Sequence, residues 1–246
     1  MRILALMYHD IFDGGAADSS GFPGGAAASY KLETDVFANH LDAIRAVRPQ
    51  LPLYLTFDDG GSSALNIAGL LEERGFKGHF FVTTDYLDTA TFMTRDEVRE
   101  LARRGHVVGS HSCSHPTRMA LCTREQMLDE WRRSKATLED VLGARVDTAS
   151  VPGGHYSRTV AEAAAEAGIR TLFTSEPTTR SHHVDGCRVH GRYAIQRMHS
   201  PTYAAALASG SVVPRTRQFV IWNVKKLGKI VAGDLYLKIR GRLLAD

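Results

Sequence analysis

Short apolar runs recur between residues 3 and 175, and helical patterns separate them. The runs are rich in β-branched and aromatic residues, which is typical of buried parallel strands. They cover residues 3–9, 51–57, 78–84, 106–111, 145–151 and 169–175. We therefore expect six buried strands that are joined by helical connections.

Apolar residues in the intervening segments repeat at helical spacing. Phe37, Leu41 and Ile44 follow one another at i, i+4 and i+7, and residues 65–71 repeat this pattern. Further helices are predicted near residues 94–105, 123–142 and 157–167, each followed by or ending at a glycine. Repeated βα units predict a parallel sheet or barrel with right-handed crossovers.

Residues with reactive side chains follow several of these strands directly. Parallel βα folds gather their functional side chains at the carboxyl ends of the strands, so we expect these residues to share one rim. They are His9 and Asp10, Asp58 and Asp59, His111 and His115, and the turn "PGGHY" at residues 152–156.

Two carboxylates and two histidines on this rim fit a metal centre. Successive side chains on a strand point to opposite faces, so Asp58 and Asp59 can serve different purposes. One of them can join His111 and His115 as a third ligand of Zn²⁺ or a similar divalent ion, leaving a position open for water. The other can accept a proton from that water.

The stretches "LTFDDGG" and "GSHSCSHPTRM" resemble the first two signature motifs of the polysaccharide deacetylases, the NodB homology domain of carbohydrate esterase family 4. "LALMYHDI" at the start resembles the branch of that family that opens on a Met-Tyr-His strand. The resemblance covers residues 3–200 and implies a distorted, incomplete (β/α) barrel. It also implies hydrolysis of N-acetyl groups on amino sugars, Asp58 as general base, and Asp59, His111 and His115 as metal ligands, with Cys113 a spacer.

The chain departs from the family pattern at two catalytic positions. Ser150 or Val151 stands where the third motif usually carries an arginine that orients the base. Arg197 in "YAIQRMHS" resembles an arginine of the Met-Tyr-His branch and is the first candidate to replace it, followed by Arg158 and Arg180. The catalytic-acid histidine has no clear counterpart; we place His199 first, with His190 and His155 as alternatives.

Other residues on the rim are expected to contact the substrate. These are His9, Asp10, Gly153, Gly154 and His155, and a backbone N–H of the turn at 153–155 is a candidate donor to the oxyanion. The Gly/Ala/Ser-rich segment 14–29 leaves the first strand on the same rim. We expect it to be a flexible cover, with Phe22 as a platform for a sugar face.

The end of the chain differs in charge from the remainder. The chain has 246 residues and a net charge of +3; from Arg215 onward the net charge is +6, so the remainder carries −3. We expect a barrel over residues 1–210 and a basic helical tail over residues 211–246. Residues 215–244 form a basic amphipathic pattern that suits an anionic membrane surface, with packing on the barrel as the alternative.

Composition narrows the expected location and partners. Three cysteines fit a reducing compartment, and the first ten residues lack the features of a signal peptide. We therefore expect a cytoplasmic protein, peripheral to the inner membrane face through its tail, with no nucleic-acid partner. Its substrate would be an N-acetylated amino sugar in a glycan or precursor, such as a lipid-linked one.

The sequence thus predicts a hydrolase of non-peptide C–N bonds that uses Zn²⁺ or another divalent metal such as Co²⁺, Ni²⁺ or Fe²⁺. Two alternatives remain open at this point. One is a metal-free C–N hydrolase of the same superfamily that acts on a small amide. The other is a non-catalytic carbohydrate-binding domain, which the missing arginine and acid would permit.

Overall fold

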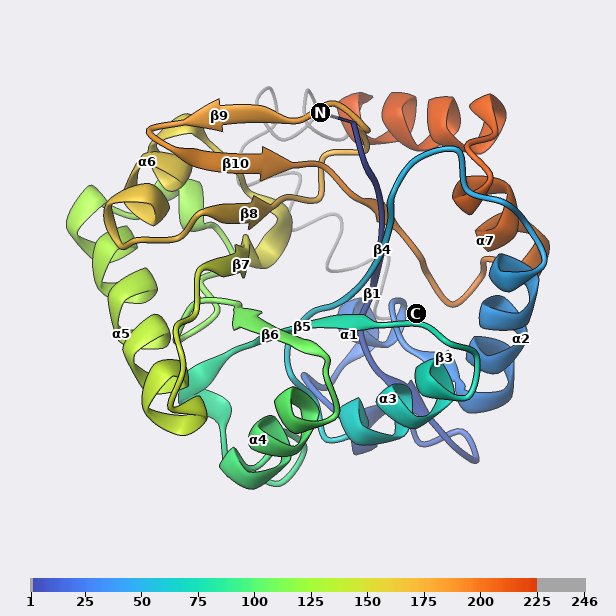
Figure 1. Cartoon of the computed structure of the whole chain (residues 1–246), viewed down its shortest axis with the longest axis horizontal. Helices are drawn as coiled ribbons and strands as arrows, with labels where there is room; N and C mark the ends of the chain where they lie inside the picture. The colour runs from blue at the N-terminus through green and yellow to red at the C-terminus, as the bar shows by residue number, and fades with distance from the viewer. Residues whose placement is uncertain (1, 225–246) are drawn as a thin grey trace.

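The computed structural model describes residues 2–224 and is built around one curved sheet of nine strands (Figure 1). The strands lie in the order β11-β1-β4-β5-β6-β7-β8-β10-β9. All neighbours are parallel except β9 and β10, which form an antiparallel hairpin. The strands are β1 (Leu4–Tyr8), β4 (Leu53–Phe57), β5 (Gly78–Val82), β6 (Val107–Ser110), β7 (Thr148–Ser150), β8 (Thr171–Phe173), β9 (His182–Val184), β10 (Cys187–His190) and β11 (Tyr193–Ala194).

Helices lie around the outside of the curved sheet (Figure 1). The long ones are α2 (Thr34–Arg45), α3 (Ala64–Glu72), α4 (Arg95–Arg103), α5 (Arg124–Leu142), α6 (Arg158–Glu166) and α7 (Pro201–Ala208). A cluster that includes Phe37, Leu41, Ile67 and Leu101 fills the space between the sheet and α2, α3, α4 and α7. A second cluster around Trp131 and Val160 packs α5 and α6 on the other half of the sheet.

The sheet curls into an incomplete barrel, because β11 and β9 are its edges and do not pair with each other. This confirms the predicted fold class. Each of the six predicted strands is present, and the helices expected at 94–105, 123–142 and 157–167 match α4, α5 and α6. The prediction missed β9, β10 and β11, and also β2 (Ile11–Phe12) and β3 (Leu32–Glu33), which pair with each other outside the main sheet.

Two of the helices show why they begin where the sequence predicts. Thr94 and Thr123 each accept a hydrogen bond from the N–H three residues later, and the side chain at that later position bonds back to the threonine N–H. These reciprocal bonds satisfy donors that the first helical turn leaves free. The two capping boxes fix the start of α4 after the β5 connection and of α5 after the loop that contains His111 and His115.

Residues 212–224 are helical and follow the predicted boundary at residue 210. Gln218 attaches this helix to the sheet, because its side-chain amide bonds the N–H and C=O of Ala194 on the edge strand β11. The division into a barrel and a separate tail stays a prediction. Lys225, Lys226 and the rest of the predicted tail lie outside the described residues, and within 2–224 no helix has the length and hydropathy of a membrane span.

Candidate metal centre and active site

The turn after β4 carries the two adjacent carboxylates, Asp58 and Asp59. Asp59 has a φ of 77° and Gly60 a φ of 84°, so two consecutive residues adopt the left-handed conformation. That conformation is uncommon for a residue with a side chain, although aspartate tolerates it better than most. The N–H of Thr83 donates to the Asp59 carbonyl at 3.1 Å and holds the turn against the end of β5.

Asp59, His111 and His115 converge on one point of the rim. Their ligand atoms all lie within 4.8 Å of one another. The Nε2 atoms of His111 and His115 lie 3.4 Å and 3.5 Å from Asp59 Oδ1. Ligands at about 2.1 Å around a tetrahedral ion are about 3.4 Å apart, so the three residues fit a divalent metal such as zinc.

The protonation of His111 also fits a metal ligand. Its Nδ1 lies 2.6 Å from Ser150 Oγ, and that hydroxyl donates to Asp58 Oδ1 at 3.0 Å. Because a hydroxyl has one hydrogen, the His111 Nδ1–H must be the donor to Ser150. The lone pair of neutral His111 is then on Nε2, the atom that faces Asp59.

The surroundings of His115 favour the neutral ring as well. Burial and the neighbouring His111 lower the pKa of His115 to about 4, so the ring carries a free lone pair near pH 7. For Asp59, burial alone would raise the pKa, but the nearby His111, His9 and His115 outweigh it and lower the pKa of the carboxyl, which keeps it ionised. One carboxylate and two imidazoles form a donor set that suits Zn²⁺.

Asp58 is held by an arginine that the sequence prediction missed. Arg192 follows β10, is fully buried, and donates from Nη1 and Nη2 to the two Asp58 oxygens at 2.7 Å each. Its Nε donates to the Thr174 carbonyl at 3.1 Å. Burial would raise the pKa of Asp58, but Arg192 and His111 hold it well below its usual range, so Asp58 is ionised.

The expectation that Arg197 contacts Asp58 is therefore wrong. Arg197 lies beyond β11, pairs with Glu33 at 3.5 Å, and stacks on the Phe12 ring at 4.7 Å. Arg158, an alternative, pairs with Glu162 on the exposed side of α6. Arg192 reaches Asp58 from a position two residues after β10, and its guanidinium lies over the Phe81 ring.

His9 lies beside the carboxylates, and His199 does not contact them. In the β1–β4 register Tyr8 pairs with Phe57, so the next residues, His9 and Asp58, are neighbours at the strand ends. His9 acts electrostatically on Asp58, Asp59 and His115, and its Nδ1 is buried without a hydrogen-bond partner in the described part of the chain.

His199 instead belongs to the start of α7. Its Nδ1 accepts from the Gln196 N–H at 3.0 Å, and its ring stacks on Tyr203 at 4.1 Å. Burial and the nearby His40 lower the pKa of His199 to about 4. A histidine that is neutral near pH 7 and faces α7 is poorly placed to protonate a leaving group on the rim.

Two other predicted substrate contacts differ in their accessibility. Asp10 is buried, and its Oδ1 accepts from Ser20 and Ser63 at 2.7 Å and 2.9 Å, which fits a structural role better than contact with a substrate. The turn at Gly153, Gly154 and His155 is open on the rim after β7. Gly153 has a φ of 63°, and a Cβ there would lie 2.3 Å from the Thr117 carbonyl.

The segment expected to be a flexible cover is tied to the barrel at several points. Lys31 is buried and donates from Nζ to the carbonyls of Ala17, Ser20 and Phe22 at 2.9, 2.5 and 2.7 Å. The Phe22 ring lies 4.7 Å from the His115 ring. The Phe22 ring thus lies beside His115, a candidate metal ligand; its contact with a sugar stays a prediction.

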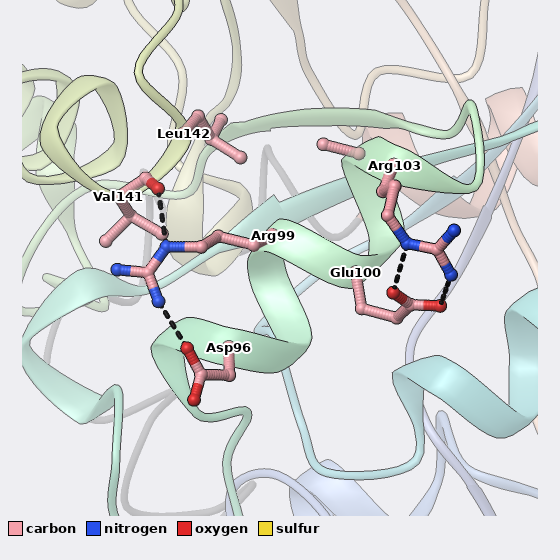
Figure 2. A pocket seen from close by; sticks show the side chains of 7 residues that line it. Asp96, Arg99, Glu100, Arg103, Val141 and Leu142 are labelled. Atoms are coloured by element: carbon pink, nitrogen blue, oxygen red, sulfur yellow. Dashed lines mark hydrogen bonds and ion pairs between the residues drawn. The ribbon is translucent and has the colours of Figure 1, made fainter.

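A hollow of about 400 Å³ lies elsewhere, between α4 and α5 (Figure 2). Its charged side chains pair with one another: Arg99 with Asp96, and Arg103 with Glu100. Arg99 also donates to the Val141 carbonyl at 2.9 Å. Because these groups satisfy each other and none belongs to the rim, the hollow does not compete with the Asp/His cluster as the functional site.

Comparison with known proteins agrees with this geometry. Residues 46–172, just over half of the chain, match the family model of polysaccharide deacetylases. A Bacillus subtilis protein, YxkH, whose name places it among polysaccharide deacetylases, is 26% identical over 160 residues, which are 65% of this chain and 55% of YxkH. The peptidoglycan-N-acetylglucosamine deacetylase PgdA of Listeria monocytogenes is 33% identical over 110 residues, 44% of this chain and 22% of PgdA.

Solved structures share the fold. The Streptococcus pyogenes deacetylase PplD, solved with acetate, has a TM-score of 0.70 at 20% identity, covering 85% of this chain and 98% of PplD. IcaB from Ammonifex degensii has a TM-score of 0.67 at 19% identity, covering 84% and 97%. The chain spans about half, or less, of the length of the curated relatives it matches. The matched residues contain both the Asp58–Asp59 and the His111–His115 motifs, and the chain belongs to the polysaccharide deacetylase family.

Proposed function

We propose that the chain is a metal-dependent hydrolase that removes N-acetyl or similar acyl groups from an amino sugar in a glycan or glycan precursor. The observation that carries the proposal is that a set of candidate metal ligands and an ionised carboxylate lie side by side on one rim. Asp59, His111 and His115 form a metal-ligand set, and beside it lies Asp58, a carboxylate kept ionised by Arg192. A pure binding domain has no use for a buried, charge-paired base next to a metal site.

Asp59, His111 and His115 would hold Zn²⁺ or another divalent ion such as Co²⁺, Ni²⁺ or Fe²⁺. When bound, the ion supplies Lewis acidity that polarises the acyl oxygen and lowers the pKa of a water. Neutral His115 and ionised Asp59 are ready to ligate without losing a proton, and the hydrogen bond from His111 Nδ1 to Ser150 leaves His111 Nε2 to face the ion. The donor set fits zinc best but does not distinguish it from these other ions.

Asp58 accepts a proton from the attacking water. Its Oδ1 accepts hydrogen bonds from Arg192 and Ser150, whereas Oδ2 accepts one from Arg192 among the described residues and keeps a lone pair for the water. The water oxygen forms a bond to the acyl carbon, and its proton goes to Asp58. The fixed guanidinium keeps the carboxylate from rotating away during this transfer.

His9 donates the proton that the leaving amine needs. It neighbours Asp58 across the β1–β4 register, whereas His199 faces α7. When the C–N bond breaks, the amine nitrogen takes the His9 proton, and the acyl group leaves as a carboxylic acid, which then loses its remaining proton to solvent. The turn at Gly153, Gly154 and His155 borders the same rim and would contact the sugar or the oxyanion.

The substrate class extends to lipid-linked amino sugars in this proposal. On the helix at 212–224, Val213, Val220 and Val224 are 77%, 52% and 62% exposed, and they share one face because they are seven and four residues apart. Such a face, followed in sequence by Lys225 and Lys226, suits an anionic membrane surface and a cytoplasmic, membrane-peripheral enzyme.

Release of acetate from N-acetylated amino-sugar oligomers tests the hydrolase proposal. We expect release by the purified chain that stops with a chelator and returns with added divalent metal. Activity that survives complete removal of metal would favour the metal-free amide hydrolase, and binding of the oligomers without any release would favour a binding domain. Flotation with anionic vesicles, at low and high salt, tests the membrane proposal separately, with Val220→Asp/Val224→Asp as the comparison variant.

A further inference from the structure

A buried glutamate on α5 holds the loop that carries His115. Glu130 accepts the backbone N–H groups of Cys113 and Ser114 on Oε2, both at 2.9 Å, and the Ser114 hydroxyl on Oε1 at 2.5 Å. Glu130 as a whole residue is 9% exposed. A carboxylate in such a place is costly to bury unless its oxygens are bonded, so its partners explain its presence.

The loop needs an external support because two of its residues adopt strained backbone conformations. Ser112 has a φ of 64° and His115 a φ of 58°, both in the left-handed region that residues with side chains avoid. Such conformations persist where the surrounding structure holds them. The N–H of His115 donates to Ser112 Oγ at 3.1 Å, so the two strained residues are also bonded to each other.

The other backbone groups of the loop are fixed by the β5 connection. Thr84 and Asp85 donate their N–H groups to the carbonyls of Ser112 and Cys113 at 3.3 Å and 3.0 Å. The carbonyls of Ser112 and Cys113 are therefore held by the β5 connection, and the N–H groups of Cys113 and Ser114 are held by Glu130. Glu130 is the one ionised group among these partners.

The charge state of Glu130 agrees with this role. Burial alone would raise the pKa of the carboxyl, but the hydrogen bonds from Ser114 and Cys113 outweigh it and lower the pKa below its usual value. Ser134, one turn further along α5, bonds Ser110 Oγ at 2.7 Å, next to His111. One helix, α5, thus contacts the chain just before His111 and again between His111 and His115.

We infer that Glu130 is a positioning residue for the metal centre: its carboxylate sets the shape of the loop 112–115 and so the place of His115 relative to Asp59 and His111. This inference rests on the proposed metal-dependent function. Groups that orient metal ligands from behind commonly change metal affinity by 10- to 100-fold when removed. Glu130 should act on affinity through the loop, without touching metal or substrate.

Three substitutions at and near Glu130 remove different numbers of its hydrogen bonds to the loop. Glu130→Leu removes every bond to the loop. Glu130→Gln keeps an oxygen for the two N–H groups, and Ser114→Ala removes one bond only. Glu125→Leu, on the exposed first turn of the same helix, is the matched control.

The measurement is the dissociation constant for Zn²⁺ by chelator competition, with the absorption spectrum of the Co²⁺ form as a report on ligand geometry. We expect ~30-fold weaker Zn²⁺ binding and an altered Co²⁺ spectrum for Glu130→Leu. A change of about threefold is expected for Glu130→Gln and Ser114→Ala, and none for Glu125→Leu. If Glu130→Leu does not fold, the Zn²⁺ dissociation constants of Ser114→Ala and Glu125→Leu still test the inference. It requires weaker binding by Ser114→Ala than by Glu125→Leu.

The outcomes separate this inference from the proposed function. A parent chain that binds no divalent metal contradicts the proposed function itself. If the parent binds Zn²⁺ and the folded Glu130 variants have dissociation constants within twofold of the parent value, the proposed role of Glu130 is overturned. The proposed function is then unaffected. A purely structural role would lower the melting temperature of the metal-free variants and leave the Zn²⁺ constant and the Co²⁺ spectrum unchanged.

Discussion

The site is built from two regions that differ in how far apart their residues lie along the sequence. At the ends of β4 and β6, the proposed base and all three ligands lie within residues 58–59 and 111–115. At the ends of β7 and β10, Ser150 and Arg192 support that base from positions 92 and 134 residues away along the chain. In the proposed function the first region carries the chemistry, and the second holds the Asp58 carboxylate ionised and in place.

This difference explains what each region demands of its sequence. The first region needs particular residue types at fixed spacing, because Asp59 and His115 lie in turns where their own backbone is in the left-handed conformation. The second region needs only that a guanidinium and a hydroxyl reach the base, so several strands of the barrel can supply them. We expect changes in the first region to remove turnover or metal, and changes in the second to act through Asp58 and His111.

The substitution Asp58→Asn should give the largest loss. An amide cannot accept the proton of the attacking water, so kcat should fall by about 10³-fold, within the usual range for a general base. Metal content should stay at the parent level because Asp58 is not in the ligand set. Steady-state acetate release and elemental analysis of the same sample check both points; a loss of less than tenfold would show that Asp58 is not the base.

Arg192→Met should act on both stability and activity, because it leaves a buried carboxylate without its partner. Breaking a buried ion pair on one side costs about 3–5 kcal/mol of unfolding free energy. Arg197→Met, whose arginine is half exposed, should cost no more than about 0.5 kcal/mol. Urea denaturation compares the two, and equal losses would contradict the assignment of Arg192 to the base.

The pH dependence of that stability difference has a defined sign. Arg192 holds the pKa of Asp58 below its usual value, so the pair stabilises the folded chain above the unfolded pKa of about 3.9 and less as pH falls below it. The gap between parent and Arg192→Met should therefore be full near pH 7 and narrow below about pH 4. A gap that stays constant down to pH 3 would mean that it comes from packing.

Replacing His9 and His199 in turn distinguishes the two histidines. His9→Ala should lower kcat by about 10²-fold, as expected for loss of a proton donor. His199→Ala should leave kcat within about threefold and lower the melting temperature, because its ring packs on Tyr203. The reverse order in a rate assay would restore the sequence-based choice of His199.

Ser150→Ala should give the smallest effect of this set. It removes the hydroxyl between His111 and Asp58, but the Ser150 carbonyl at 3.2 Å can still accept the His111 Nδ1–H. We expect about tenfold weaker Zn²⁺ binding with a similar drop in kcat/KM. Ser200→Ala, at the start of α7, is a control; if both variants bind Zn²⁺ like the parent, Ser150 is not part of the support.

The sequence predicted the first region well because its signals are local. Six strands, the rim, Asp58, Asp59, His111 and His115 all follow from apolar periodicity and from motif spacing, and the structure places them together. The second region was missed because a buried arginine has no periodic signature. Arg197 was chosen from its resemblance to a motif, although it pairs with Glu33 and not with Asp58.

One local signal could have led to Arg192. Asp185 and Gly186 have φ values of 48° and 82° and connect β9 to β10, and Asp-Gly is a strong hairpin signal between short strands. A hairpin there makes residues 187–190 a strand, and the next residues, Gly191 and Arg192, then fall at its end. Glu130 had no such signal, because its partners are backbone N–H groups of a loop far from it in sequence.

The central claim is that metal and base are separate units on one rim. Its most direct measurement is the Zn²⁺ content of three purified forms: the parent chain, His115→Ala and Asp58→Asn, each after removal of loosely bound metal. We predict one Zn²⁺ per chain in the parent and in Asp58→Asn, and none in His115→Ala. Equal metal content in the parent and in His115→Ala, or loss of metal from Asp58→Asn, would contradict the account.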